Sequence, residues 1–243
     1  MKKTRKEQKI LTIYVNLPDR EFDIPHFLEG KPFNIAICPY SIVNQTLSDR
    51  AIEKITDLLH KKCLLVQRGY RGRCKYDHID GTDPWHENLC TEWSNPSISL
   101  NEQSDIMLRG KSVLLRTFGF APYGYQAPNH LWDTNTLKVV EVMPYKFIMD
   151  KNMIGLSMYN KHSVLVIPEV NILKDNDDKT MFSSGAYVAM DRLRDDYVHD
   201  YLSSIELITP FDISPERNSL EKLTINEQKK RISKMQRDLD NLL

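Results

Sequence analysis

The chain has 243 residues, of which 41% are hydrophobic and 9% aromatic, so it is long enough to bury a substantial core in one domain. Its 33 basic and 33 acidic residues cancel, which leaves no overall field to attract a nucleic acid or an anionic membrane surface. No stretch approaches the roughly 20 apolar residues that a membrane helix needs. We therefore expect a soluble, cytoplasmic protein with no nucleic-acid or membrane partner.

The four cysteines show no CxxC spacing. Cys38 and Cys63 lie in apolar runs, where a thiol behaves as a small hydrophobic group. Reduced cytosolic thiols are the expected state, and the alternative is that Cys74 and Cys90, which flank a loop, pair outside the cell.

The N-terminus is basic and then apolar, which is also a feature of signal peptides. The apolar part is short, contains Tyr14 and Asn16, and has no small-residue cleavage site. We interpret residues 1–9 as a charged leader and residues 10–17 as a buried strand.

The elements that follow alternate between strand-like and helix-like patterns of apolar residues. Residues 33–38 and 64–67 are apolar runs typical of strands. Between them residues 49–62 carry apolar side chains at helical spacing, and the segment Thr46-Leu47-Ser48-Asp49 can cap this helix. Further strands are predicted at 147–149, 164–167 and 187–190, and helices at 99–108, before Phe118, at 134–143 and at 195–205. Strands that alternate with helices favour a parallel sheet or barrel.

Two segments lack a clear strand assignment. Residues 70–96 are polar with weak periodicity, which indicates a long loop and a candidate binding rim. Residues 216–243 form a C-terminal amphipathic helix in this interpretation, with apolar side chains at three- and four-residue steps. Such a stripe docks on its own domain or, alternatively, forms a coiled coil and a homo-oligomer.

Two motifs resemble the polysaccharide deacetylases, that is, carbohydrate esterase family 4 and its divergent relatives. That family has a His-Gly-Tyr-x-His type motif after a strand, and here the segment LLVQRGYRG occupies residues 64–72. A later Gly-Phe-Arg-Ala-Pro motif corresponds to Gly124-Tyr125-Gln126-Ala127-Pro128. The resemblance covers roughly residues 10–212. It implies an α/β fold, a distorted (β/α) barrel of seven strands over residues 10–215, with a glycan-binding groove at the C-terminal ends of the strands.

In active members of this family, one Asp and two His hold a divalent metal, usually zinc, which activates a water against an acetyl group. Here Arg68 and Gly72 stand at the two His positions, and neither can ligate a metal. Asn16 stands at the Asp position, and Gln126 replaces an arginine. The resemblance therefore implies no metal cofactor at the usual site. Zinc or another divalent ion remains possible only if the loop of residues 77–92, rich in Asp, His and Glu, supplies a remodelled site.

The resemblance also selects candidate site residues. As catalytic groups it points to Asp19, His130 and Asp191. As substrate-binding groups it points to Arg68, Tyr70, Glu92, Tyr125, Gln126, Asn129 and Trp132. Arg68 would attract a sugar carboxylate or phosphate or, alternatively, pair with Asp19 or Asp191. The aromatic residues would contact sugar rings or simply fill the barrel.

Three functions remain open at this point. The first is a deacetylase-like protein that has lost metal-dependent hydrolysis and binds an N-acetylated glycan or related carbohydrate. The second is an active hydrolase that removes acetyl groups from an amino sugar with a remodelled site. The third is a non-catalytic interaction partner of an active paralogue. Fold alone does not choose among them.

Overall fold

The computed structural model describes residues 7–15, 22–43, 45, 47–70, 99–127, 130, 132–151, 159–161, 164–172 and 184–212. Their centre is a closed barrel, because β1 pairs with β2 at one side and with β8 at the other. Every pairing in the ring is parallel. The barrel strands in chain order are β1 (Gln8–Val15), β2 (Asn34–Ile37), β3 (Leu64–Arg68), β4 (Gly124–Gln126), β5 (Phe147–Lys151), β7 (Val164–Asn171) and β8 (Gly185–Ala189). The predicted seven-stranded (β/α) barrel is thus confirmed.

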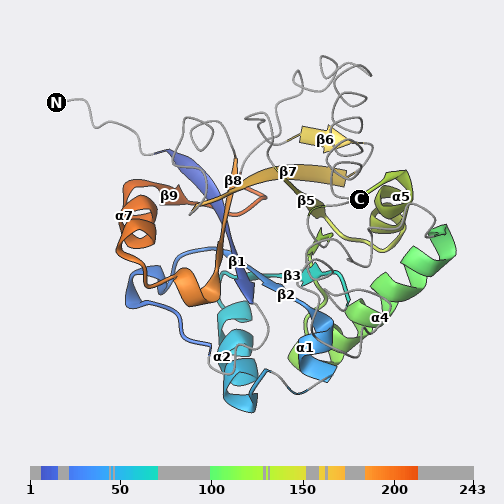
Figure 1. Cartoon of the computed structure of the whole chain (residues 1–243), viewed down its shortest axis with the longest axis horizontal. Helices are drawn as coiled ribbons and strands as arrows, with labels where there is room; N and C mark the ends of the chain where they lie inside the picture. The colour runs from blue at the N-terminus through green and yellow to red at the C-terminus, as the bar shows by residue number, and fades with distance from the viewer. Residues whose placement is uncertain are drawn as a thin grey trace, which may run out of the picture.

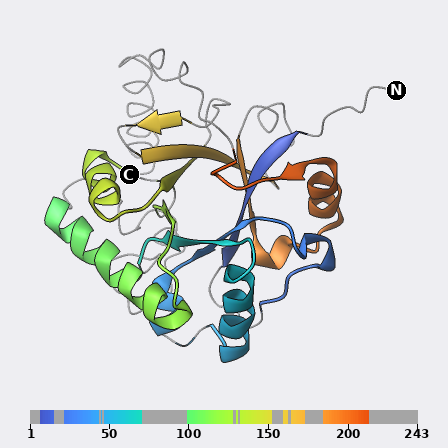
Figure 2. The ribbon, with the colours of Figure 1, turned by 180° about the vertical axis from the view of Figure 1, so that it is seen from behind.

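Helices surround this ring, as the two opposite views show (Figures 1 and 2). They are α1 (Pro39–Val43), α2 (Asp49–Leu59), α4 (Leu100–Phe118), α5 (Thr134–Val142) and α7 (Asp196–Ser204), with short 3-10 turns η1 (His26–Leu28) and η3 (Met190–Arg192). Two short strands lie outside the ring: β6 (Tyr159–Lys161), antiparallel to β7, and β9 (Glu206–Leu207), parallel to β1. None of the described helices is long and apolar enough to cross a membrane.

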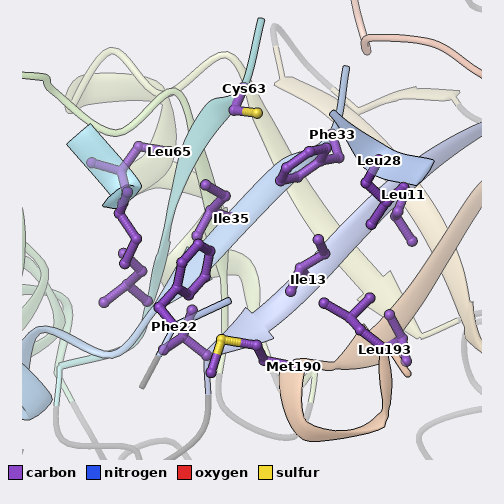
Figure 3. Packing of buried hydrophobic residues seen from close by; sticks show 14 of the residues in the cluster. Leu11, Ile13, Phe22, Leu28, Phe33, Ile35, Cys63, Leu65, Met190 and Leu193 are labelled. Carbon is purple, nitrogen blue, oxygen red and sulfur yellow. The ribbon is translucent and has the colours of Figure 1, made fainter. Parts of the chain in front are cut away.

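Side chains alternate between the outside and the lumen of the barrel, as they must on a pleated strand. On β1, Leu11 and Ile13 belong to an outer core that also contains α2 and α7 residues, whereas Ile10 and Tyr14 belong to the lumen. Figure 3 shows this outer core from close by, with Ile13 and Ile35 on the neighbouring strands β1 and β2. A second outer core packs α4 and α5 against β4, β5 and β7.

Two predicted helices are one. Residues 99–108 and the segment before Phe118 form the single helix α4, which Ser99 caps by accepting a hydrogen bond from Glu102 N. The helix continues through Gly110, where α4 packs closely on β3. A Cβ at this position would lie 2.3 Å from Gln67 Nε2, so the site has no room for a side chain. The glycine is therefore kept for packing, not for a turn.

Other boundaries differ by a few residues. Strand β1 already begins at Gln8, within the expected leader, and β7 continues to Asn171, four residues past the expected end at Ile167. The three-residue strand β4 replaces part of the expected motif loop. Residues 16–17 of the expected first strand, most of the 70–96 loop and the C-terminal helix at 216–243 lie outside the described residues.

Candidate functional site

A polar layer closes the C-terminal end of the lumen. In a barrel of parallel strands the carboxyl ends all meet at one edge, which is where sites in such folds form. The alternation that puts Ile10, Val66 and Ile167 in the lumen brings residues two or four positions further along the same strands to this edge. The layer contains Tyr14, Arg68, Gln126, Glu169 and Tyr187.

His130 joins this layer from the segment after β4. Its Nε2 lies 2.8 Å from Glu169 Oε1 and 2.9 Å from Tyr14 Oη. Tyr14 Oη also donates a short hydrogen bond to the same Oε1 atom. Because a carboxylate oxygen only accepts, the imidazole must carry its proton on Nε2, and one oxygen of Glu169 then receives both donors.

The second carboxylate oxygen of Glu169, Oε2, receives no such hydrogen bonds from the described residues. Glu169 is 0% exposed, and its Oε2 has no hydrogen-bond partner among the described residues. The side-chain amide oxygen of Gln126 is also buried and also has no hydrogen-bond partner among the described residues. The Gln126 amide nitrogen donates to Ala127 O. The layer therefore contains two buried acceptors that the described chain does not satisfy.

Tyr14 contacts four other residues of this layer, which are Arg68, His130, Glu169 and Tyr187. Burial, the charge of Glu169 and the hydrogen bond to it together raise the pKa of Tyr14 well above its usual value, so the phenol stays protonated and donates. The Tyr187 ring stacks on it at a centroid distance of 4.8 Å, and the Arg68 guanidinium lies 4.8 Å from its centroid. Arg68 and Tyr187 are half-buried at this edge of the barrel.

His130 has an unusual backbone. Its φ of +58° lies in the left-handed region, which side chains with a Cβ seldom adopt. The His130 amide donates to Ala127 O at 2.8 Å, and the imidazole contacts with Glu169 and Tyr14 fix the other end of the residue. A strained residue that is held from both ends is typical of functional sites.

The structure brings three predicted site residues together: His130, Arg68 and Gln126. Asp19, Glu92 and Asn129 lie outside the described residues, as do the 77–92 loop and the Asn16 and Gly72 positions. Asp191 is exposed in η3 and makes no hydrogen bond or ion pair with His130 or Glu169. Within the described part of the chain, its catalytic role stays a prediction without a contact to support it.

Two aromatic candidates face away from the lumen. Tyr125 is 0% exposed in the outer core under α5, because it alternates with Gly124 and Gln126 on β4. Trp132 packs against the same core, where its Nε1 donates to Asp150 Oδ1 at 3.1 Å. Tyr70 lies near the end of β3, and its carbonyl accepts from Tyr40 N and Cys38 Sγ. Tyr125 and Trp132 therefore pack in the outer core, and a ligand contact of Tyr70 stays a prediction.

Sequence reasoning missed Tyr14, Glu169 and Tyr187. One signal was available for Glu169, because it is the only charged residue in the apolar run from Val164 to Val170. A buried carboxylate in a strand requires partners, and this points to a site.

The described residues of this layer do not fit a metal centre. Among them, no group of three or more His, Cys, Asp or Glu side chains converges. The guanidinium of Arg68 has no lone pair to donate, and the lone pairs of Glu169 Oε1 already accept from Tyr14 and His130. No step below depends on a metal.

Fold and site together define a (β/α) barrel protein with a polar layer at the C-terminal edge. No protein-family model and no curated protein matches the sequence. Solved structures do match: a 4-alpha-glucanotransferase from Thermococcus litoralis (TM-score 0.56, 9% identity, 86% of this chain, 40% of that one) and a putative polysaccharide deacetylase from Mycobacterium smegmatis (0.52, 10%, 90% and 96%). A CE4 family pseudoenzyme from Bacillus anthracis also matches (0.51, 9%, 86% and 65%).

The chain thus spans less than half the length of the glucanotransferase that it matches. At these identities the likeness shows the fold, which is the barrel of the polysaccharide deacetylases, and not the activity.

Proposed function

We propose that this protein is a deacetylase-fold protein without metal-dependent hydrolysis that binds an N-acetylated glycan or a related carbohydrate at the C-terminal edge of its barrel. The carrying observation is that Tyr14 and His130 both donate to Glu169 Oε1. Tyr14, His130 and Glu169 Oε1 are bonded to one another, and among the described residues no third His, Cys, Asp or Glu side chain converges with His130 and Glu169 to complete a metal site.

Arg68 adds a second argument. It stands where the family resemblance expects a metal-ligating His, and it places a permanent positive charge beside the Tyr14 ring. A fixed cation favours anionic or acceptor groups of a ligand. The half-buried Tyr187 ring beside it offers a flat surface of the kind that sugars contact.

Calorimetric titration with chito-oligosaccharides tests this proposal. We expect saturable binding by the whole chain and about tenfold weaker binding by Arg68→Gln, which removes the charge. The matched control is Arg109→Gln, because Arg109 is exposed on α4, outside the barrel strands. Absence of binding, or equal loss in both variants, would contradict the proposal.

One observation favours a second function, an acetyl-sugar hydrolase with a remodelled site. The His130 and Glu169 pair has the geometry of an acid–base dyad, in which the carboxylate orients the imidazole and leaves a lone pair on Nδ1. An acetate-release assay with parallel metal analysis separates the two functions. Release that His130→Ala abolishes supports the hydrolase, whereas binding without release supports the first proposal.

A further inference from the structure

The carboxylate of Glu169 is satisfied on one side only. Its Oε1 receives two donors, from Tyr14 and His130, while Oε2 receives none from any described residue. A carboxylate has lone pairs for about four hydrogen-bond donors. A buried carboxylate oxygen that receives no donor loses its bonds to water without replacing them, which costs free energy. The structure therefore holds a negatively charged acceptor ready for a donor that the described chain does not supply.

The chemistry of the neighbours restricts that donor. Tyr14 and His130 already use their hydrogens on Oε1, so they cannot turn to Oε2 without releasing it. Arg68 contacts the face of the Tyr14 ring, whereas Glu169 contacts its hydroxyl, so positive and negative charges meet different parts of the same side chain. A ligand that fits both groups carries a cationic donor for Glu169 and acceptor groups for Arg68.

We propose that Glu169 Oε2 binds the free amino group of a sugar unit, so that the protein recognises a de-N-acetylated or partly de-N-acetylated glycan. This inference rests on the proposed glycan binding and specifies its ligand. An ammonium gives a charge-assisted hydrogen bond to the buried carboxylate. An acetamide offers a neutral N–H and also brings a carbonyl oxygen, which a carboxylate repels.

Access to Glu169 requires neighbouring side chains to move, because Glu169 is 0% exposed. We expect His130 to be one that moves, since it comes from the segment after β4 and its backbone is in the left-handed region. Releasing that residue recovers part of its backbone strain, which lowers the cost of opening. His130→Gly keeps the same φ without strain, removes the imidazole, and is expected to bind the amino sugar more tightly than the natural chain.

The experiment compares glucosamine trimer with N-acetylglucosamine trimer by calorimetry at a pH where the amine is protonated. The natural chain is expected to bind the amino trimer about tenfold more tightly. Glu169→Gln is expected to abolish that preference, because the neutral amide no longer attracts the ammonium. Asp150→Asn is the matched control: Asp150 is also a buried strand carboxylate, but it faces the outer core and bonds Trp132.

The outcomes separate the two proposals. Equal binding of both trimers, or preference for the acetylated one, overturns the amino-group inference and leaves glycan binding intact. Retention of the preference in Glu169→Gln overturns it as well. Failure of both trimers to bind overturns the inference together with the proposed function. Should Glu169→Gln not fold, the preference of the natural chain and its increase in His130→Gly still decide the question.

Discussion

His130 Nε2 and Glu169 Oε1 lie 2.8 Å apart, although 39 positions separate the two residues in the chain. One comes from the turn after β4 and the other from the interior of β7. Closure of the barrel brings them together, and Tyr14 joins them from β1. This contact links a histidine whose backbone is in the left-handed region to a fully buried carboxylate.

Replacement of His130 should separate backbone strain from hydrogen bonding. His130→Ala and His130→Gly both lose the bonds to Glu169 and Tyr14, but only glycine adopts a φ of +58° without penalty. We expect the glycine variant to be more stable than the alanine variant by about 1 kcal/mol in urea unfolding. Equal stability of the two variants would show that His130 is not strained.

Stability should fall in alkali, and Tyr14 should account for part of the fall. Burial and Glu169 raise the pKa of Tyr14, so between about pH 10 and that raised pKa the folded chain keeps a proton that the unfolded chain releases. The free energy of unfolding therefore decreases by up to about 1.4 kcal/mol per pH unit for this group. Burial also raises the pKa of Tyr145 and of Tyr201, which adds to the slope.

Urea titrations between pH 9 and pH 11 check this sign. Tyr14→Phe should lower the slope by about one proton relative to the natural chain. The matched control for the loss of a tyrosine hydroxyl is Tyr123→Phe, since Tyr123 is 43% exposed. A slope that Tyr14→Phe does not alter would mean that Tyr14 titrates normally.

Gly110 should resist substitution in spite of its helical position. Alanine is the better helix former by about 1 kcal/mol, but its Cβ would lie 2.3 Å from Gln67 Nε2 and 3.0 Å from Pro39 Cγ. Gln67 cannot yield freely, because its amide donates to Gly69 O and Met107 O. We expect Gly110→Ala to destabilise the fold by about 1–3 kcal/mol, and Arg109→Ala on the same helix to change stability by under about 0.5 kcal/mol.

Thermal unfolding measures this difference directly. A stabilising Gly110→Ala would contradict the close packing of α4 on β3.

The N-terminal cap of α5 should contribute more to the free energy of unfolding than that of α7. Asp133 accepts from Thr136 N at 2.8 Å and also from buried Gln103, whereas Asp195 makes no capping hydrogen bond to α7 and its carboxylate pairs with exposed Arg192. Asp133→Ala should therefore cost about 1–2 kcal/mol in urea unfolding and Asp195→Ala clearly less. The reverse order would show that the capping box of α5 contributes little.

The sequence predicts most of the barrel because its strands are apolar runs bounded by polar turns. Strand β4 escapes this rule, since three residues are too few to show a periodicity and Gly124 adds no side chain. The sequence predicts helix α4 as two segments, residues 99–108 and one before Phe118, and the nearness of Gln67 accounts for Gly110 inside the single continuous helix.

The site was predictable only in part. A motif points to His130, Arg68 and Gln126, because the family resemblance places them after β3 and β4. Their partners Tyr14 and Glu169 come from strands whose register a single sequence does not reveal. The outward direction of Tyr125 follows from the same alternation, which cannot be assigned until β4 is known to be a strand.

A crystal structure of the protein with a partly N-acetylated chito-oligosaccharide tests the central claim most directly. We predict an intact sugar chain at the C-terminal edge of the barrel, in contact with Arg68 and Tyr187, with no metal between it and His130. Sugar bound elsewhere on the molecule, or acetate and a metal ion beside His130, would contradict a barrel that binds glycans without hydrolysing them.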